Sequence, residues 1–268
     1  MDMKKRISRA RNVSPLQRFG LLVISLVLGI SLWYLVAGLL NLPAFILPGP
    51  GLVWDRFLRA FTNGQLIQHS LATLLEVLAG LLLGGTVATI LGYFLAKSPA
   101  FENLISPYLV ASQSIPVVAI APLLVIWFGP GIFSKILICS LTVFFPVLIN
   151  TVVGLREVPQ DLRDLMQSLK ASRTQTLLKL EIPAALPIFL GGLRVGATLS
   201  VIGAVVGELV GADRGLGFLI NVGRGQYDTA LVFVAVITLA VMAMSLYGLV
   251  LLIETRVLSW QSWREGAG

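Results

Sequence analysis

The feature that most constrains this fold is a set of long apolar runs, each of 18 to 26 residues with almost no charged side chain. The chain is 56% apolar and only 12% charged. A bilayer core of about 30 Å takes about 20 helical residues, and every backbone amide within it must be paired inside its own segment. The runs do not alternate with period two, as barrel strands would. They predict an all-α integral membrane protein with six spanning helices, at residues 19–40, 71–96, 104–128, 136–153, 186–210 and 230–253.

The remaining segments are too short to build a soluble core of their own, which predicts a single domain. We divide the chain into a basic N-terminal segment at 1–18, a membrane domain at 19–256 that includes a charged loop at 157–185, and a C-terminal tail at 257–268. The first apolar run has no small-residue cleavage site. It is therefore interpreted as a retained helix and not as a signal peptide.

Basic residues gather on one side of the predicted membrane. Six crossings place both termini on the same face, and 15 of the 20 Lys and Arg fall on that face. By the positive-inside tendency it is cytoplasmic. The net charge of +7 then follows from topology and does not indicate nucleic acid, because no stacking aromatics accompany the basic residues. The basic N-terminal segment is expected to contact anionic membrane lipid.

Several kinds of chemistry are excluded by what the sequence lacks. The single cysteine, Cys139, lies in the middle of a predicted span and is expected to pack there. The single histidine, His69, is expected just outside the second span as an interfacial polar residue, and without a Cys or carboxylate cluster it predicts no metal site. The sequence has no phosphate-binding G-x-x-x-x-G-K-[ST] loop. We therefore expect no ATP hydrolysis and no cofactor on this chain, so that any energy comes from another subunit.

The only long charged segment between two apolar runs is DLMQSLKASRTQTLLKLEIPAALP, at residues 164–187. An apolar stripe with spacing i, i+3, i+4 and i+7 predicts a short amphipathic helix just before and within it. That stripe consists of Leu162, Leu165, Met166 and Leu169. Ser172 and Gln175 predict a capping box that starts a second short helix, and Pro183 and Pro187 are expected to end it. Such a stripe fits either a lipid surface or a groove on a protein, and the short, doubly tethered loop favours the groove.

This charged loop resembles the cytoplasmic loop of permease subunits of binding-protein-dependent ABC importers. Their pattern is Glu-Ala-Ala, three residues, Gly, nine residues, Ile, one residue, Leu-Pro. Here the same spacing gives Asp164-Leu165-Met166, then Lys170, then Leu180, then Ile182-Pro183, with the small residues and the glycine replaced. Further pieces are similar to the same family, and together they cover roughly residues 45–255: LPGP at 47–50, SIPVVAIAPLLVIWFG at 114–129, FFPVLINTVVGLREVP at 144–159, IPAALPIFLGGLRVG at 182–196 and GELVGADRGLG at 207–217.

The resemblance implies a type I ABC importer permease fold in the bacterial plasma (inner) membrane, with a cytoplasmic coupling helix between spans four and five. It also implies a second permease copy, two ATP-binding subunits that hold ATP-Mg, and an extracytoplasmic substrate-binding protein. Whether the two permeases are identical stays open, although a homodimer is the expected form. The residues expected to contact the ATPase are Asp164, Leu165, Met166, Leu169, Lys170, Ala171, Ile182 and Pro183.

Two acids inside predicted spans, Glu76 and Glu208, are candidates for the translocation pathway, because buried carboxylates in membranes usually face a bundle interior or a watery route. The alternative is that they bond other helices. Ser112, Gln113 and Ser114 precede Pro116 in the third span and complete the predicted lining. No lysine or arginine is expected at the depth of the acids. This favours a neutral or weakly basic ring over a small anion.

The resembling branch includes permeases for nitrate, bicarbonate, sulfonates, taurine and pyrimidine-type vitamin precursors. We expect a thiamine-pyrimidine or related vitamin precursor as substrate, with nitrate, bicarbonate, sulfonate or taurine as alternatives. A secondary transporter is the distant alternative, but no internal repeat is evident. An intramembrane enzyme would need paired catalytic groups, and none are found.

Small residues four apart mark the fifth span as a close-packed helix, either within the chain or at a dimer seam. They are Gly192, Gly196, Gly203, Gly207 and Gly211. The segment 211–228 that follows is expected on the outer face. It is either a contact for the binding protein or a plain connection.

Overall fold

The computed structural model describes residues 15–39 and 43–259. Within these ranges the chain is helical, with no strand. The predicted N-terminal segment at 1–18 and tail at 257–268 lie largely outside the described residues. The helices are α2 (Pro15–Leu39), α3 (Pro50–Thr62), α4 (Gln65–Lys97), α5 (Pro99–Gln113), α6 (Val117–Phe128), α7 (Ile132–Arg156), α8 (Gln160–Ser168), α9 (Arg173–Thr176), the π-helix η1 (Leu177–Glu181), α10 (Ile182–Gly211), α11 (Leu216–Gly225) and α12 (Thr229–Val257).

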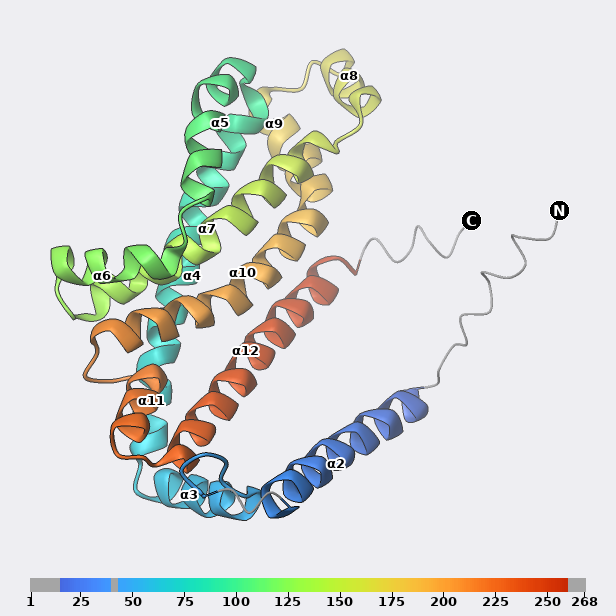
Figure 1. Ribbon diagram of the computed structural model, residues 1–268. Coiled ribbons are helices and arrows are strands. Elements are labelled where there is room, and N and C mark those ends of the chain that lie inside the picture. The colour runs from blue at the N-terminus through green and yellow to red at the C-terminus, as the bar shows by residue number, and fades with distance from the viewer. Residues whose placement is uncertain (1–14, 40–42, 260–268) are drawn as a thin grey trace.

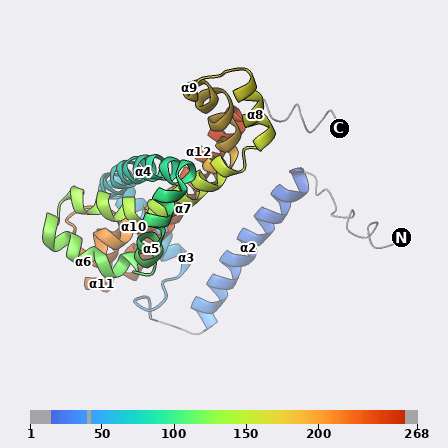
Figure 2. The same cartoon turned by 90° about the horizontal axis from the view of Figure 1, so that it is seen from above.

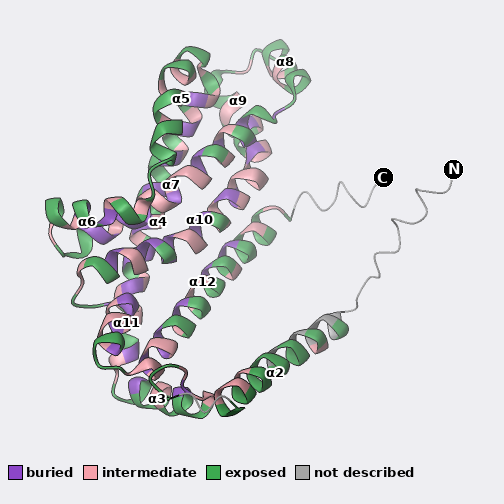
Figure 3. Ribbon diagram, in the orientation of Figure 1, coloured by how far each residue is buried: buried purple, intermediate pink, exposed green. Residues whose placement is uncertain are grey.

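The core of the fold is the contact between α4, α7 and α10, with α12 packed against α10 (Figure 1). Buried residues concentrate where these helices cross (Figure 3). Two glycines permit the close approach. A Cβ at Gly84 of α4 would lie 2.8 Å from the Cα of Ser140, and a Cβ at Gly203 of α10 would lie 2.9 Å from the Cα of Cys139. Because lipid supplies no hydrophobic drive between helices, such backbone contact is what holds them together.

Four of the predicted spans correspond to helices that are long and apolar enough to cross a membrane: α4, α7, α10 and α12. Each extends beyond both predicted ends, by several residues at one end at least. The first predicted run falls on α2, of which Val23–Leu39 is apolar over fewer than 18 residues. The described residues therefore contain four such helices, or five if a bent pair counts as one span.

The bent pair corrects the third predicted span, because residues 104–128 are not one helix. α5 and α6 meet at an angle of 94°. Pro116 stands at the N-cap of α6 in an extended conformation, with φ −62° and ψ 127°. Proline has no N–H to continue the hydrogen bonds of α5, and it disfavours helical geometry in the preceding residue. The chain therefore turns sharply at this point (Figure 1).

Short helices occupy opposite ends of the bundle. α8 and α9 lie at one end, and α3 and α11 lie at the other (Figure 1). α2 extends away from the remaining helices in both views (Figures 1 and 2). It touches them near its C-terminal end, where the Trp33 ring stacks on Phe233 at 5.3 Å and Trp33 Nε1 donates to the Pro48 carbonyl at 3.1 Å.

Candidate coupling and translocation sites

The predicted amphipathic helix exists as α8, which begins after Pro159 and carries its apolar row outward. Leu162, Leu165 and Leu169 are 41%, 53% and 69% exposed, and Met166 is half-buried. None of the residues of α8 is buried. An exposed row of leucines on a short helix at the end of a bundle is suited to burial against another molecule.

α8 is held by a polar contact from Arg163 and by its closing turn, and not by its apolar face. Arg163 Nη2 donates to the Leu155 carbonyl at 2.7 Å and so satisfies an acceptor in the last turn of α7. At the other end Lys170 has φ +53°. The Ala171 N–H donates to the Met166 carbonyl at 2.9 Å, which closes the helix. A left-handed residue after a helix favours glycine, and Lys170 stands where the permease pattern has glycine.

The capping box predicted at the next helix is present. The Ser172 hydroxyl accepts from the Gln175 N–H at 3.2 Å, and Gln175 Oε1 accepts from the Ser172 N–H at 2.8 Å.

The prediction that Pro183 and Pro187 end this helix is wrong, because the chain stays helical over Arg173–Gly211. The π-helix η1 changes the register, so that the Ile182 N–H donates to the Leu177 carbonyl, and Pro183 falls in the first turn of α10, where no N–H is needed.

Ion pairs join this end of the bundle to α4 and α5. Lys97 at the end of α4 pairs with Glu181 of η1, whose carboxylate is buried. Arg156 at the end of α7 pairs with Glu102 of α5 at 2.5 Å. These pairs fix η1 to α4 and the end of α7 to α5.

The two intramembrane acids lie together at the opposite end. Glu208 is fully buried; its Oε1 accepts from the Thr73 hydroxyl at 2.6 Å, and its Oε2 accepts from the Gly217 N–H at 2.5 Å. The Thr73 hydroxyl in turn accepts from the Leu216 N–H at 2.8 Å. Glu208 thus joins the end of α10 to α4 and to the first turn of α11. Its carboxylate faces no aqueous route in this conformation.

The prediction that no cation accompanies the acids is wrong. Lys135, in the first turn of α7, is buried, and its Nζ lies 3.8 Å from Glu76 Oε1 and 3.0 Å from the Pro130 carbonyl, to which it donates. Glu76 is also buried, and its Oε2 has no hydrogen-bond partner among the described residues. In this conformation both carboxylates are enclosed, as in the alternative in which the acids bond other helices. Because Lys135 supplies a positive charge beside Glu76, repulsion by the acids no longer disfavours a small anion as substrate.

His69 is not an interfacial residue outside the helix, because α4 begins at Gln65 and so extends past it. Its ring is mostly buried, stacks on Phe218 at 5.5 Å, and its Nδ1 accepts from the Gly215 N–H at 3.0 Å. Gly215 has φ +110°, a conformation open to glycine. The segment 211–228 is therefore more than a plain connection: it contains α11 and is bonded to α4.

The polar triplet predicted for the lining lies apart from the acids. Ser112, Gln113 and Ser114 stand at the bend between α5 and α6 and are exposed. Ser112 and Ser114 donate to carbonyls of their own helix, at Leu109 and Val110. The predicted pathway residues therefore form two separate groups, one exposed and one buried.

The small-residue stripe of α10 faces helices of the same chain. A Cβ at Gly196 would lie 3.2 Å from Val143, one at Gly207 would lie 3.1 Å from Lys135, and one at Gly211 would lie 2.9 Å from Val125. Gly192 faces Asn150 in the same way. These four glycines, like Gly203, are occupied by intrachain packing against α6 and α7.

Sequence reasoning missed Thr73, Lys135 and Gly217 as partners of the acids. Thr73 stands three residues before Glu76 and so shares a helix face with it, a usable signal. Lys135 precedes the fourth apolar run directly. Gly217 gave no signal, because its role is that of a backbone donor.

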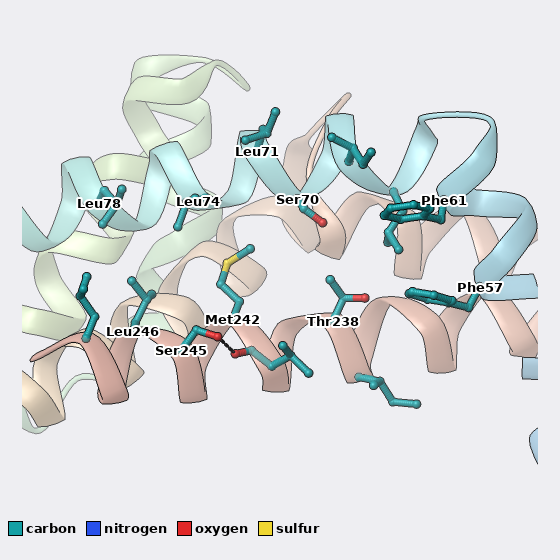
Figure 4. A pocket seen from close by; sticks show the side chains of 15 residues that line it. Phe57, Phe61, Ser70, Leu71, Leu74, Leu78, Thr238, Met242, Ser245 and Leu246 are labelled. Atoms are coloured by element: carbon teal, nitrogen blue, oxygen red, sulfur yellow. Dashed lines mark hydrogen bonds between the residues drawn. The ribbon is translucent and has the colours of Figure 1, made fainter. Parts of the chain in front are cut away.

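A cavity of about 800 Å³ opens between α3, α4 and α12. Figure 4 shows the side chains that line it. Most of them are apolar, among them Phe57, Leu74 and Met242. It contains none of the predicted pathway residues. Its lining is unsuited to a polar solute.

The chain is similar to the riboflavin transport system permease protein RibX of Chloroflexus aurantiacus, with 46% identity over 254 residues that cover 93% of this chain and 95% of that protein. It is 33% identical to the formylaminopyrimidine transport permease protein ThiX of Halalkalibacterium halodurans, over 86% of this chain and 91% of that protein. It is 32% identical to the taurine transport system permease protein TauC of Escherichia coli, over 86% of each chain.

The family model for the inner membrane component of binding-protein-dependent transport systems matches residues 84–259. This stretch includes α8, the bend-forming α5–α6 pair and the whole of α10. The relatives are non-catalytic transport permeases, in agreement with the absence of an ATP-binding loop. The chain belongs to the family of inner membrane permease subunits of binding-protein-dependent ABC transporters.

Proposed function

We propose that this chain forms the translocation pathway of an ATP-driven importer and receives the motion of a separate ATPase through α8. The observation that carries the proposal is the exposed leucine row of α8. In the chain, α8 directly follows α7 and is joined through α9 and η1 to α10, and α7 and α10 are the two helices that pack most extensively on each other. A force on α8 would reach that pair through these chain connections. Rigid-body displacement of packed helices is a common way to convert such a force into opening and closing.

The assembly that we propose contains two copies of this chain, two ATP-binding subunits that hold ATP-Mg, and an extracytoplasmic binding protein. The end that carries α8 is proposed to be cytoplasmic, with both termini on that side of the bacterial plasma membrane. The α2 helix and the bent pair α5–α6 complete six crossings. Their exposed apolar surfaces support this arrangement, since lipid or a second copy would cover them.

The docking face is proposed to consist of Leu165, Met166 and Leu169, with Asp164, Lys170 and Ala171 beside it. Ile182 is exposed and Pro183 is half-buried, and both lie farther along the same loop.

The pathway lining is proposed to include three polar residues that are exposed at a bend in the membrane domain, Ser112, Gln113 and Ser114. Glu76 and Glu208 are assigned to the support of the opposite end, because their carboxylates are enclosed.

The substrate that we propose is a polar nitrogen heterocycle of the riboflavin or pyrimidine-precursor type. Its support is the higher identity to the riboflavin permease than to the taurine permease, 46% against 32%. Taurine, sulfonates, nitrate and bicarbonate remain the second candidate class, which the buried Lys135 now makes electrostatically reasonable. A gradient-driven carrier is the distant alternative.

The coupling test compares Leu165→Asp with Ser168→Asp in vesicles that contain this chain, its ATPase and its binding protein. Both substitutions add one negative charge to α8, but Ser168 lies outside the apolar row. We expect Leu165→Asp to reduce uptake about thirtyfold, the effect of losing about 2 kcal/mol at a docking hot spot, while Ser168→Asp stays close to the unmodified protein. Normal coupled uptake by Leu165→Asp would remove the assignment.

The substrate test uses the same vesicles with riboflavin, formylaminopyrimidine, taurine and nitrate as labelled solutes. ATP-dependent accumulation of either heterocycle supports the proposal. Transport of taurine or nitrate alone contradicts the substrate class and leaves the coupling proposal intact. Accumulation without the ATPase favours a gradient-driven carrier.

A further inference from the structure

A polar cavity of about 670 Å³ lies between α8, α9, η1 and the end of α4. Its charged lining residues are Lys97, Arg163, Arg173 and Glu181. Lys97 and Glu181 pair with each other, so two guanidinium groups are in excess. Arg163 Nε is buried without a hydrogen-bond partner, and Arg173 makes no ion pair with any residue that the structure describes. Such a cavity is suited to an anion, which guanidinium groups bind through paired N–H donors.

An apolar groove continues from this cavity into the membrane domain. The next cavity along α4 has a volume of about 440 Å³ and shares Tyr93 with the polar one. A third cavity, of about 590 Å³, shares Thr89, Ile90 and Phe189 with the second and ends at Leu78. These shared walls make a single groove along α4 that faces α10.

The groove is long enough to span one membrane leaflet. From Leu78 to Tyr93 an α-helix rises about 22 Å, which exceeds the half-thickness of a hydrocarbon core, about 15 Å. A cationic cavity at the mouth and an apolar groove below it match the two chemical parts of a phospholipid. A free phosphate would leave the groove empty, and an apolar helix from a second copy would leave the guanidinium groups without a counter-charge.

We propose that this groove binds an anionic phospholipid, with its phosphate at Arg163 and Arg173 and an acyl chain along α4. Basic pockets between membrane helices at one end of a bundle are suited to such headgroups. Because both arginines belong to the loop that carries α8, the lipid also stabilises the position of that loop. The proposal requires only this chain and a membrane, so its failure would leave the transport proposal intact.

The headgroup test measures phosphatidylglycerol retained by the full-length protein in native mass spectra, after purification from phosphatidylcholine nanodiscs with increasing phosphatidylglycerol. Arg173→Gln is expected to weaken retention about fivefold, the effect of one basic residue near an anionic headgroup. The matched control is Lys179→Gln, because Lys179 is an exposed cation of η1 outside the cavity. Equal losses for the two variants would overturn the proposal, since they would indicate general attraction to the loop.

The acyl-chain test compares Thr89→Phe, which fills the groove, with Val87→Phe, which adds the same ring to an exposed position of α4 outside it. We expect Thr89→Phe to reduce phosphatidylglycerol retention and Val87→Phe to leave it unchanged. If inorganic phosphate displaces the lipid and Thr89→Phe has no effect, the cavity is a phosphate site only. If Thr89→Phe abolishes the dimer peak in the native mass spectrum but leaves phosphatidylglycerol retention unchanged, a second copy of the chain occupies the groove. Either result overturns the lipid assignment.

Discussion

Two short helices of nearly equal length connect long helices at opposite ends of this molecule, and they are held in opposite ways. α8 has nine residues, none of them buried, and its leucines face outward. α11 has ten residues, of which Leu216, Gly217, Leu219 and Gly223 are buried. The difference indicates that α11 completes the fold of this chain, whereas α8 has an apolar row that only another molecule can bury.

Polar contacts follow the same division. The first turn of α11 donates backbone N–H groups to Thr73 and Glu208, and the preceding Gly215 donates to His69. Its far end is fixed by Asp228, which accepts from Arg56 of α3 at 2.7 Å. Among the described residues, the side-chain hydrogen bond that joins α8 to another helix runs from Arg163 to the Leu155 carbonyl of α7. Substitutions in α11 should therefore affect stability, and substitutions in α8 should affect transport.

The largest expected effect is that of Glu208→Ala. It leaves the buried Gly217 N–H without an acceptor and creates a cavity, at a combined cost of about 4 kcal/mol in the free energy of unfolding. Glu208→Gln keeps the size and one acceptor oxygen and should lose less than half as much. The measurement is unfolding by SDS in mixed micelles, followed by tryptophan fluorescence. Wild-type stability of Glu208→Ala would contradict the view that α11 is anchored by this residue.

A smaller effect is expected for Gly217→Ala in α11. The added Cβ would lie 2.8 Å from the Glu208 Cβ and 3.0 Å from the Val205 carbonyl, so a loss of about 2 kcal/mol is expected from overpacking. Gly225→Ala is the matched control, because no atom lies within 4 Å of its added Cβ. It should be neutral or stabilise by about 0.5 kcal/mol. Equal effects at the two positions would show that α11 is not closely packed at its start.

The smallest expected effect on stability is that of Leu165→Ala in α8, below about 0.5 kcal/mol, because half of the side chain is already exposed. Leu219→Ala in α11 makes the same truncation at a fully buried position and should cost about 2 kcal/mol or more. Both are measured by the same SDS titration, with uptake assayed in parallel. A large loss of stability in Leu165→Ala would mean that α8 packs within its own chain.

Much of the fold could be predicted from the sequence, because membrane insertion depends on length and apolarity, which are local properties. The apolar runs predicted α4, α7, α10 and α12, and the Ser172–Gln175 spacing predicted the capping box. The prolines were harder to interpret. Pro116 lies within a run that was predicted to be one span, but the chain bends there by 94°, whereas Pro183 and Pro187 were expected to end a helix that in fact continues. A proline removes one hydrogen bond, and the neighbouring helices decide whether the chain bends or adapts.

By itself the sequence determined the class of the molecule, its family and the position of the loop that carries α8. Only the tertiary structure decided which polar groups meet. Glu208 is 135 residues from Thr73, and Lys135 is 59 residues from Glu76. An apolar run specifies that a helix lies in the membrane, but not its rotation about its own axis or the identity of its neighbours. Those are set by backbone approach at glycines such as Gly84 and Gly203, and the approach exists only once the helices have packed.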